Sequence, residues 1–112
     1  MKYAVPISDD VLCPHFGHCE QFALIDVDDI KKEIIQKQMV PAPVHQPGLL
    51  PPWLANQGVN CVIAGSMGMN AQNLFLNQGV KVIVGAMEGN PDKLVIDHLN
   101  GNLVTGENAC DH

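Results

Sequence analysis

The chain has 112 residues, with six lysines, no arginine and twelve carboxylates, and its formal net charge is −6. This length fits one domain with an ordinary core, and the shortage of basic residues argues against a nucleic-acid partner, because phosphates favour clustered Lys and Arg. The amino-terminal segment lacks the apolar run of a signal peptide and no later run is long enough to cross a bilayer, so a cytoplasmic protein without membrane contact is expected.

The first forty residues contain three predicted strands. Residues 2–6 form a short strand that ends at a proline, residues 21–27 form a second, and residues 33–40 form a third that is partly exposed. Because the links between them are short, the three strands are expected to form an antiparallel meander. Residues 41–52 hold five prolines and are predicted to be a loop.

After this loop the pattern changes to an alternation of helix and strand. The predicted elements are a helix at 52–57, a strand at 61–64, a helix at 71–77 capped by Asn70, a strand at 81–84, and a helix that starts at Asn90-Pro91 and stops at Gly101. The continuous apolar runs of these two strands are typical of buried parallel strands. We therefore predict an α/β fold with a five-stranded mixed sheet and helices on its faces, as one domain over residues 1–105 with a flexible tail at 106–112.

Two short segments concentrate the side chains that bind soft metals. The loop between the first two strands, Cys13-Pro14-His15-Phe16-Gly17-His18-Cys19, is named here the Cys/His loop, and the chain ends in Cys110-Asp111-His112. The spacing of the loop cysteines is that of neither a zinc ribbon nor a ferredoxin, so an open or shared site is favoured over a closed cage. The predicted metal ligands are Cys13, His15, His18, Cys19, Cys110 and His112. Two alternatives stay open: partly buried structural cysteines with surface histidines in the loop, and a dispensable tail instead of a lid over the site.

A glycine-rich segment follows the first of the buried strands. Gly65, Ser66, Met67 and Gly68, named here the glycine loop, lie where open α/β sheets usually bind ligands, and they are predicted to contact a cofactor. The segment lacks the Lys of a P-loop, and Ala64 replaces the first glycine of a hydrolase nucleophile elbow. A tight strand-to-helix turn with no ligand is the alternative.

Several of these features occur together and in order in one known family. They are His15-Phe16-Gly17 before Phe22, the Asp26-Val27-Asp28 turn, His45 in the Pro-rich loop, Gly65 with Gly68 to Ala71, and Val82 to Gly89 before the last helix. In this set the chain resembles the dinitrogenase iron-molybdenum cofactor family. The resemblance implies a ribonuclease H-like fold without nuclease activity, an iron-sulfur or molybdenum-containing cluster as ligand, and His45 as a further cofactor-binding residue.

The leading hypothesis is a non-enzymatic protein that binds or delivers a metal cluster, with a cluster donor or acceptor protein as its partner. The alternatives are a zinc- or redox-sensing interaction module that uses the Cys/His loop, and a small-molecule enzyme that uses His15 and a thiolate. We expect His15 to lie close to the glycine loop, with both Cys/His groups at one end of the domain. Cys61, in an apolar strand, is expected to be a core residue without a ligand role.

Overall fold

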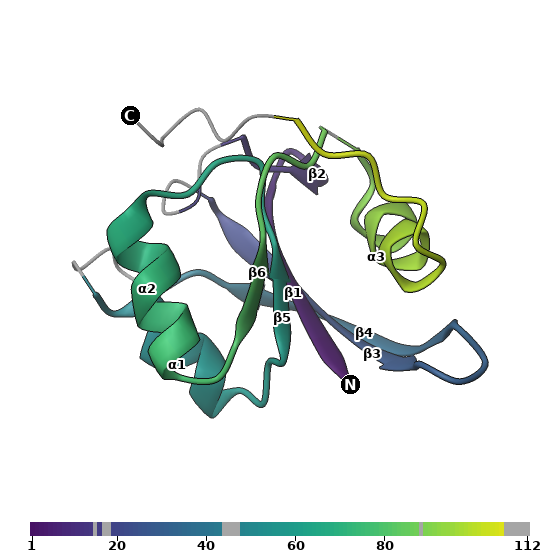
Figure 1. Cartoon of the computed structure of the whole chain (residues 1–112), viewed down its shortest axis with the longest axis horizontal. Helices are drawn as coiled ribbons and strands as arrows, with labels where there is room; N and C mark the ends of the chain where they lie inside the picture. Colours follow the sequence, from purple (N-terminus) through teal and green to yellow (C-terminus); the bar gives the residue numbers. More distant parts are fainter. Residues whose placement is uncertain (15, 17–18, 44–47, 88, 107–112) are drawn as a thin grey trace.

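The computed structural model describes residues 1–14, 16, 19–43, 48–87 and 89–106. Its elements, in chain order, are β1 (Lys2–Ser8), β2 (Val11–Leu12), β3 (Gln21–Asp28), β4 (Glu33–Pro41), α1 (Leu50–Asn56), β5 (Cys61–Ile63), α2 (Met69–Asn77), β6 (Lys81–Ile83) and α3 (Pro91–Leu99). Figure 1 shows α1 and α2 on one face of a twisted sheet and α3 on the other. Within the described ranges, no helix is long and apolar enough to span a membrane.

The sheet is mixed, and its main path runs in the order β4-β3-β1-β5-β6. The pairs β1–β3 and β3–β4 are antiparallel, whereas β1–β5 and β5–β6 are parallel. The predicted meander followed by α/β units is therefore confirmed. The finer ribonuclease H-like assignment stays a prediction.

The predicted number of strands is wrong, because the sheet has six strands instead of five. The additional strand, β2, pairs with the end of β1 through Ile7 opposite Leu12 and Ser8 opposite Val11. The two residues between them, Asp9 and Asp10, both have positive φ, at 54° and 66°. Two left-handed residues in succession are what a type I′ hairpin turn requires, and Asp tolerates this conformation better than most residues. A two-residue strand is too short to show in a hydrophobic pattern.

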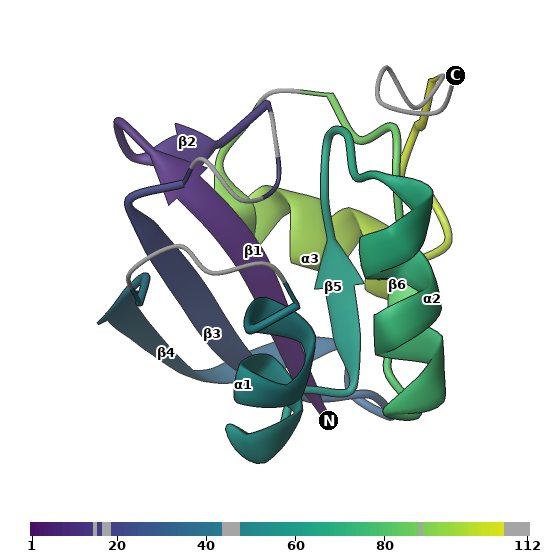
Figure 2. The same cartoon turned by 90° about the vertical axis from the view of Figure 1, so that its left-hand side faces the viewer.

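The strands bury side chains on both faces of the sheet. On the α3 face, Tyr3, Val5 and Ile7 of β1 pack in one cluster with Leu94 and Val95. Figure 2 shows α1 and α2 over the opposite face. This face carries a second cluster, in which Ala4 and Phe22 meet residues of α1 and α2. This alternation follows the two-residue period of a strand, and burial on both faces explains the apolar middle of β1 and the continuous apolar run of β5.

The helices start close to the predicted positions, with one correction at α2. The N-cap of α2 is Gly68, whose extended backbone (φ −65°, ψ 153°) leads into the helix, so Asn70 lies inside the first turn and is not the cap. The first helix, α1, begins at Leu50, two residues before the predicted start, with a proline in its first turn. Both differences follow from main-chain geometry that residue preferences alone do not determine.

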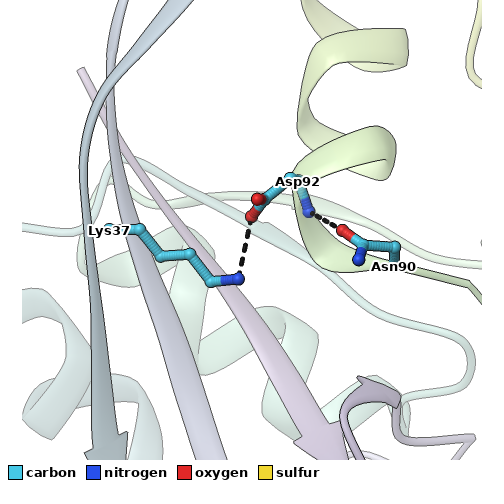
Figure 3. A network of polar contacts seen from close by, with 3 residues as sticks. All are labelled: Lys37, Asn90 and Asp92. Atoms are coloured by element: carbon cyan, nitrogen blue, oxygen red, sulfur yellow. Dashed lines mark hydrogen bonds and ion pairs between the residues drawn. The ribbon is translucent and has the colours of Figure 1, made fainter.

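The start of α3 is fixed by polar contacts to its own cap and to the sheet. Asn90 is the N-cap, as predicted, and its Oδ1 accepts a hydrogen bond from the Asp92 amide at 2.9 Å. The Asp92 carboxylate also forms an ion pair with Lys37 of β4, in which Lys37 Nζ and Asp92 Oδ1 are 3.0 Å apart (Figure 3). Both side chains are partly exposed, so this ion pair contributes about 1 kcal/mol at most. The pair links the start of α3 to β4.

A partly buried tyrosine-histidine pair joins β1 to the carboxyl end of α3 and gives a first prediction. The Tyr3 hydroxyl lies 2.6 Å from Nδ1 of His98, and the two rings meet edge to face. Burial raises the pKa of Tyr3 to about 12, so this hydroxyl donates to a neutral imidazole. Burial, and secondarily the charge of Lys81, lowers the pKa of His98 below its ordinary value. The unfolded chain therefore binds a proton at His98 more readily than the folded chain does.

We expect the stability that neutral His98 supplies to be present above a pH of about 6.5 and to be lost as the pH falls through the lowered folded pKa. Urea unfolding at a series of pH values from 8 to 5 measures this loss. The same series on His98→Gln is the control, and its free energy of unfolding should depend less steeply on pH. If the free energy of unfolding depended equally on pH in the two proteins, the attribution of this dependence to His98 would be contradicted.

Candidate functional site

Loops from three neighbouring strands meet at one edge of the sheet. Because β1, β5 and β6 are parallel, their carboxyl ends point the same way, toward the top of Figure 1. The described parts of three segments lie there: the Cys/His loop, which follows the β1–β2 hairpin, the glycine loop after β5, and residues 84–89 after β6. This edge is named here the carboxyl edge, and ligand sites of open α/β sheets usually form at such a place.

The Cys/His loop and the glycine loop touch directly. Ser66 donates a hydrogen bond from Oγ to the Pro14 carbonyl oxygen at 2.7 Å, and the Phe16 amide donates to the Ser66 carbonyl oxygen at 3.0 Å. Gly65 lies so close that a Cβ atom on it would stand 3.0 Å from the Pro14 oxygen. The two loops therefore open on the same edge, as predicted, although His15 itself lies outside the described residues.

The third segment continues this set of contacts to the end of the described chain. The Gly85 amide donates to the Gly65 carbonyl at 2.8 Å, and the Gly106 amide donates to the Gly85 carbonyl at 2.7 Å. An isolated antiparallel β-bridge between Ala86 and Thr105 also joins these two segments. The carboxyl-terminal tail therefore starts from the carboxyl edge. Gly85 was missed from the sequence, although it follows its strand by two residues just as Gly65 does.

The aromatic ring of Phe16 anchors the middle of the Cys/His loop in the core. Its ring centroid lies 5.5 Å from that of Phe75 in α2 and 5.9 Å from that of Phe22 in β3. Phe22 in turn lies 5.8 Å from Trp53 of α1. The middle of the Cys/His loop is thus held by an aromatic cluster at Phe16.

The described site candidates differ in their access to solvent. Cys13 is buried, with 4% of its surface exposed, and Cys19 is half-buried against the core cluster on the α1 and α2 face. Met67 is also buried and packs in that cluster, so its side chain belongs to the core and is not exposed at the edge. The thioethers exposed near the edge are those of Met69 and Met87. Gly68 has open space around it, with no atom within 4 Å of an added Cβ.

The remaining site candidates lie outside the described residues: His15, His18, His45, Cys110 and His112. Among the residues that are described, no group of three or more His, Cys, Asp or Glu side chains is placed to hold a metal ion. The described donors of the predicted ligand set are therefore Cys13 and Cys19, which border the loop.

The thiol of Cys61 belongs to the core, as predicted. It is 2% exposed in β5 and stands beside Tyr3 of β1 in the parallel ladder. Burial raises the pKa of Cys61 to about 11, against a smaller opposite effect of Lys81. The thiol stays protonated near neutral pH, and a protonated buried thiol is a poor metal ligand.

The topology and the convergent loops define a mixed α/β protein with a loop-built edge beyond its parallel strands. The family model "Dinitrogenase iron-molybdenum cofactor" matches residues 1–101, and the chain belongs to this family. An uncharacterized protein of Methanocaldococcus jannaschii is 35% identical over 85 residues, which cover 73% of this chain and 72% of that protein.

Two solved structures have the same fold. The crystal structure of PH0822 has a TM-score of 0.86 at 24% identity, and the match covers 94% of each chain. The apo form of the orange protein from Desulfovibrio gigas has a TM-score of 0.71 at 22% identity, over 96% of this chain and 93% of that one. At these identities the similarity concerns the fold alone.

Proposed function

We propose that the protein binds an iron-sulfur or molybdenum-containing cluster at its carboxyl edge and delivers it to another protein without catalysing a reaction. The observation that carries the proposal is the direct contact of the Cys/His loop with the glycine loop through Ser66 and Pro14. The family match over residues 1–101 supports a ligand of this class. The partners would be cluster donor or acceptor proteins, and a cytoplasmic location belongs to the same proposal.

An open site with few protein ligands would suit a cargo better than a permanent cofactor. A structural metal cage surrounds its ion with four ligands, whereas a carrier must release what it holds. The proposed ligands are the four Cys and His side chains of the Cys/His loop together with Cys110 and His112, and His45 would add a contact. Gly68, with open space around it, would let a bulky cluster approach the main chain.

The residues of β1 argue against a nuclease built on the same sheet. A two-metal nuclease needs carboxylates that converge on the sheet, and β1 carries none between Lys2 and Ser8. The proposed ribonuclease H-like fold would therefore serve binding here and not phosphodiester chemistry.

Metal analysis of the protein purified without oxygen tests the proposal. Iron with acid-labile sulfide, or molybdenum, in the purified protein is the expected result. Stoichiometric zinc would replace the proposal with the zinc-sensing module. A protein that retains no metal and exposes a reactive thiol would contradict both and favour an enzyme.

A further inference from the structure

We infer that Ser66 is a positioning residue, which ties the Cys/His loop to the glycine loop and thereby slows the release of metal from the carboxyl edge. The two hydrogen bonds that it makes to Pro14 and Phe16 are named here the Ser66 contact. The inference rests on the proposed function for its second half, the release of metal. Its first half, the tying of the loop, concerns the metal-free protein alone.

Ser66 is built into the fold as a bridge and not as an exposed ligand. It is 3% exposed, and it is the only polar residue among the buried ones that the structure describes. Its hydroxyl donates to Pro14 and its carbonyl accepts from Phe16, so one residue satisfies main-chain groups on both sides of position 15. A buried polar side chain with this geometry orders its neighbours.

The neighbours of Ser66 bring the loops to the distance that the contact needs. Gly65 has no side chain, and an added Cβ would lie 3.0 Å from the Pro14 oxygen, so the Cys/His loop would have to shift by a few tenths of an ångström. On the other side, the Phe16 ring is seated against Phe22 and Phe75. The loop is therefore held by the Ser66 contact together with an aromatic anchor, and Gly65 makes room for both.

The sequence places His15 between the two residues that the Ser66 contact holds. Loss of one neutral hydrogen bond shifts an opening equilibrium by about fivefold. A loop that opens fivefold more often lets a bound metal exchange correspondingly faster, because its proposed ligands leave together. Ser66 would thus set the residence time of the cargo without touching it.

Two pairs of variants separate this role from a general loss of stability. Ser66→Ala removes the hydroxyl and Ser66→Thr keeps it. Gly65→Ala disturbs the same contact from the other side, whereas Gly68→Ala adds the same methyl group to the same loop in open space. Two readouts on metal-free protein are hydrogen exchange at the Phe16 amide and maleimide labelling of Cys13 relative to Cys61, which is buried in β5 and serves as internal reference.

In Ser66→Ala and Gly65→Ala, Phe16 exchange and Cys13 labelling should rise by about fivefold or more, with Cys61 labelling unchanged. Ser66→Thr and Gly68→Ala should match the wild type. Unchanged Phe16 exchange in both disruptive variants would overturn the inference, as would a parallel rise in Cys61 labelling, which indicates global unfolding.

Release of iron to a chelator, from protein reconstituted without oxygen using ferrous iron and sulfide, tests the second half. Release should be about fivefold faster from Ser66→Ala than from the wild type, and Ser66→Thr should restore the slow rate. A loosened loop with unchanged iron release would overturn the inference and leave the proposed function standing. A wild-type protein that holds no metal would overturn the inference and the proposed function together.

Discussion

Gly85→Ala is expected to lower the free energy of unfolding by about 2–4 kcal/mol and to detach the end of the described chain from the carboxyl edge. Gly85 has a φ of +81°, which side-chain-bearing residues rarely adopt, and a Cβ atom on it would overlap the carbonyl oxygen of Gly106. The variant therefore combines backbone strain with a steric clash. Relief of the clash requires Gly106 to move, and its hydrogen bond to Gly85 would be lost.

Gly79→Ala is the matched control for this variant. Gly79 has nearly the same φ, +75°, but no atom lies within 4 Å of an added Cβ, so the control carries the backbone strain of about 1–2 kcal/mol alone. Urea unfolding of both variants and hydrogen exchange at the Gly106 amide measure the difference. Equal stabilities, with Gly106 still protected in Gly85→Ala, would show that the contact is not needed.

Much of the fold could be predicted because its signals are local. The apolar runs around Val62 and Val82 indicated buried parallel strands. Prolines and glycines between these runs marked where the helices start and end, and so indicated the order of the elements. The hairpin at Asp9 and Asp10 was missed because its signal is a pair of backbone dihedrals and not a pattern of side chains. Local backbone geometry also explains the misplaced cap of α2.

The candidate site was predictable only in part, since its key contacts join distant residues. Parallel topology alone indicated that the Cys/His loop and the glycine loop would share an edge. The approach of Gly85 to Gly106, and the use of Ser66 as a bridge to Pro14, depend on tertiary packing that no local pattern reveals. Met67 was assigned to the cofactor from its position in the loop, yet its side chain is buried, because core packing outweighs loop position.

Cys19→Ala is expected to weaken metal binding by at least about tenfold, because loss of a direct ligand should cost at least as much as loss of a residue that supports one. Cys19 is half-buried at the end of the Cys/His loop, so it is the more exposed of the two described loop cysteines. Competition with a chromogenic chelator under anaerobic conditions measures the affinity. An unchanged affinity would remove Cys19 from the ligand set.

Cys61→Ala is the matched control, because it makes the same chemical change at a thiol of the core. Its stability should fall by about 1 kcal/mol, while its metal affinity stays that of the wild type, since the Cys61 pKa of about 11 keeps the thiol protonated.

Deletion of residues 110–112, titrated alongside, extends the comparison to the tail. If Cys110 and His112 supply ligands, the deletion weakens binding, and the affinity of the full chain falls as the pH drops below the histidine pKa of about 6.5. An affinity that the deletion leaves unchanged would confine the site to the Cys/His loop and the glycine loop, which the Ser66 contact joins.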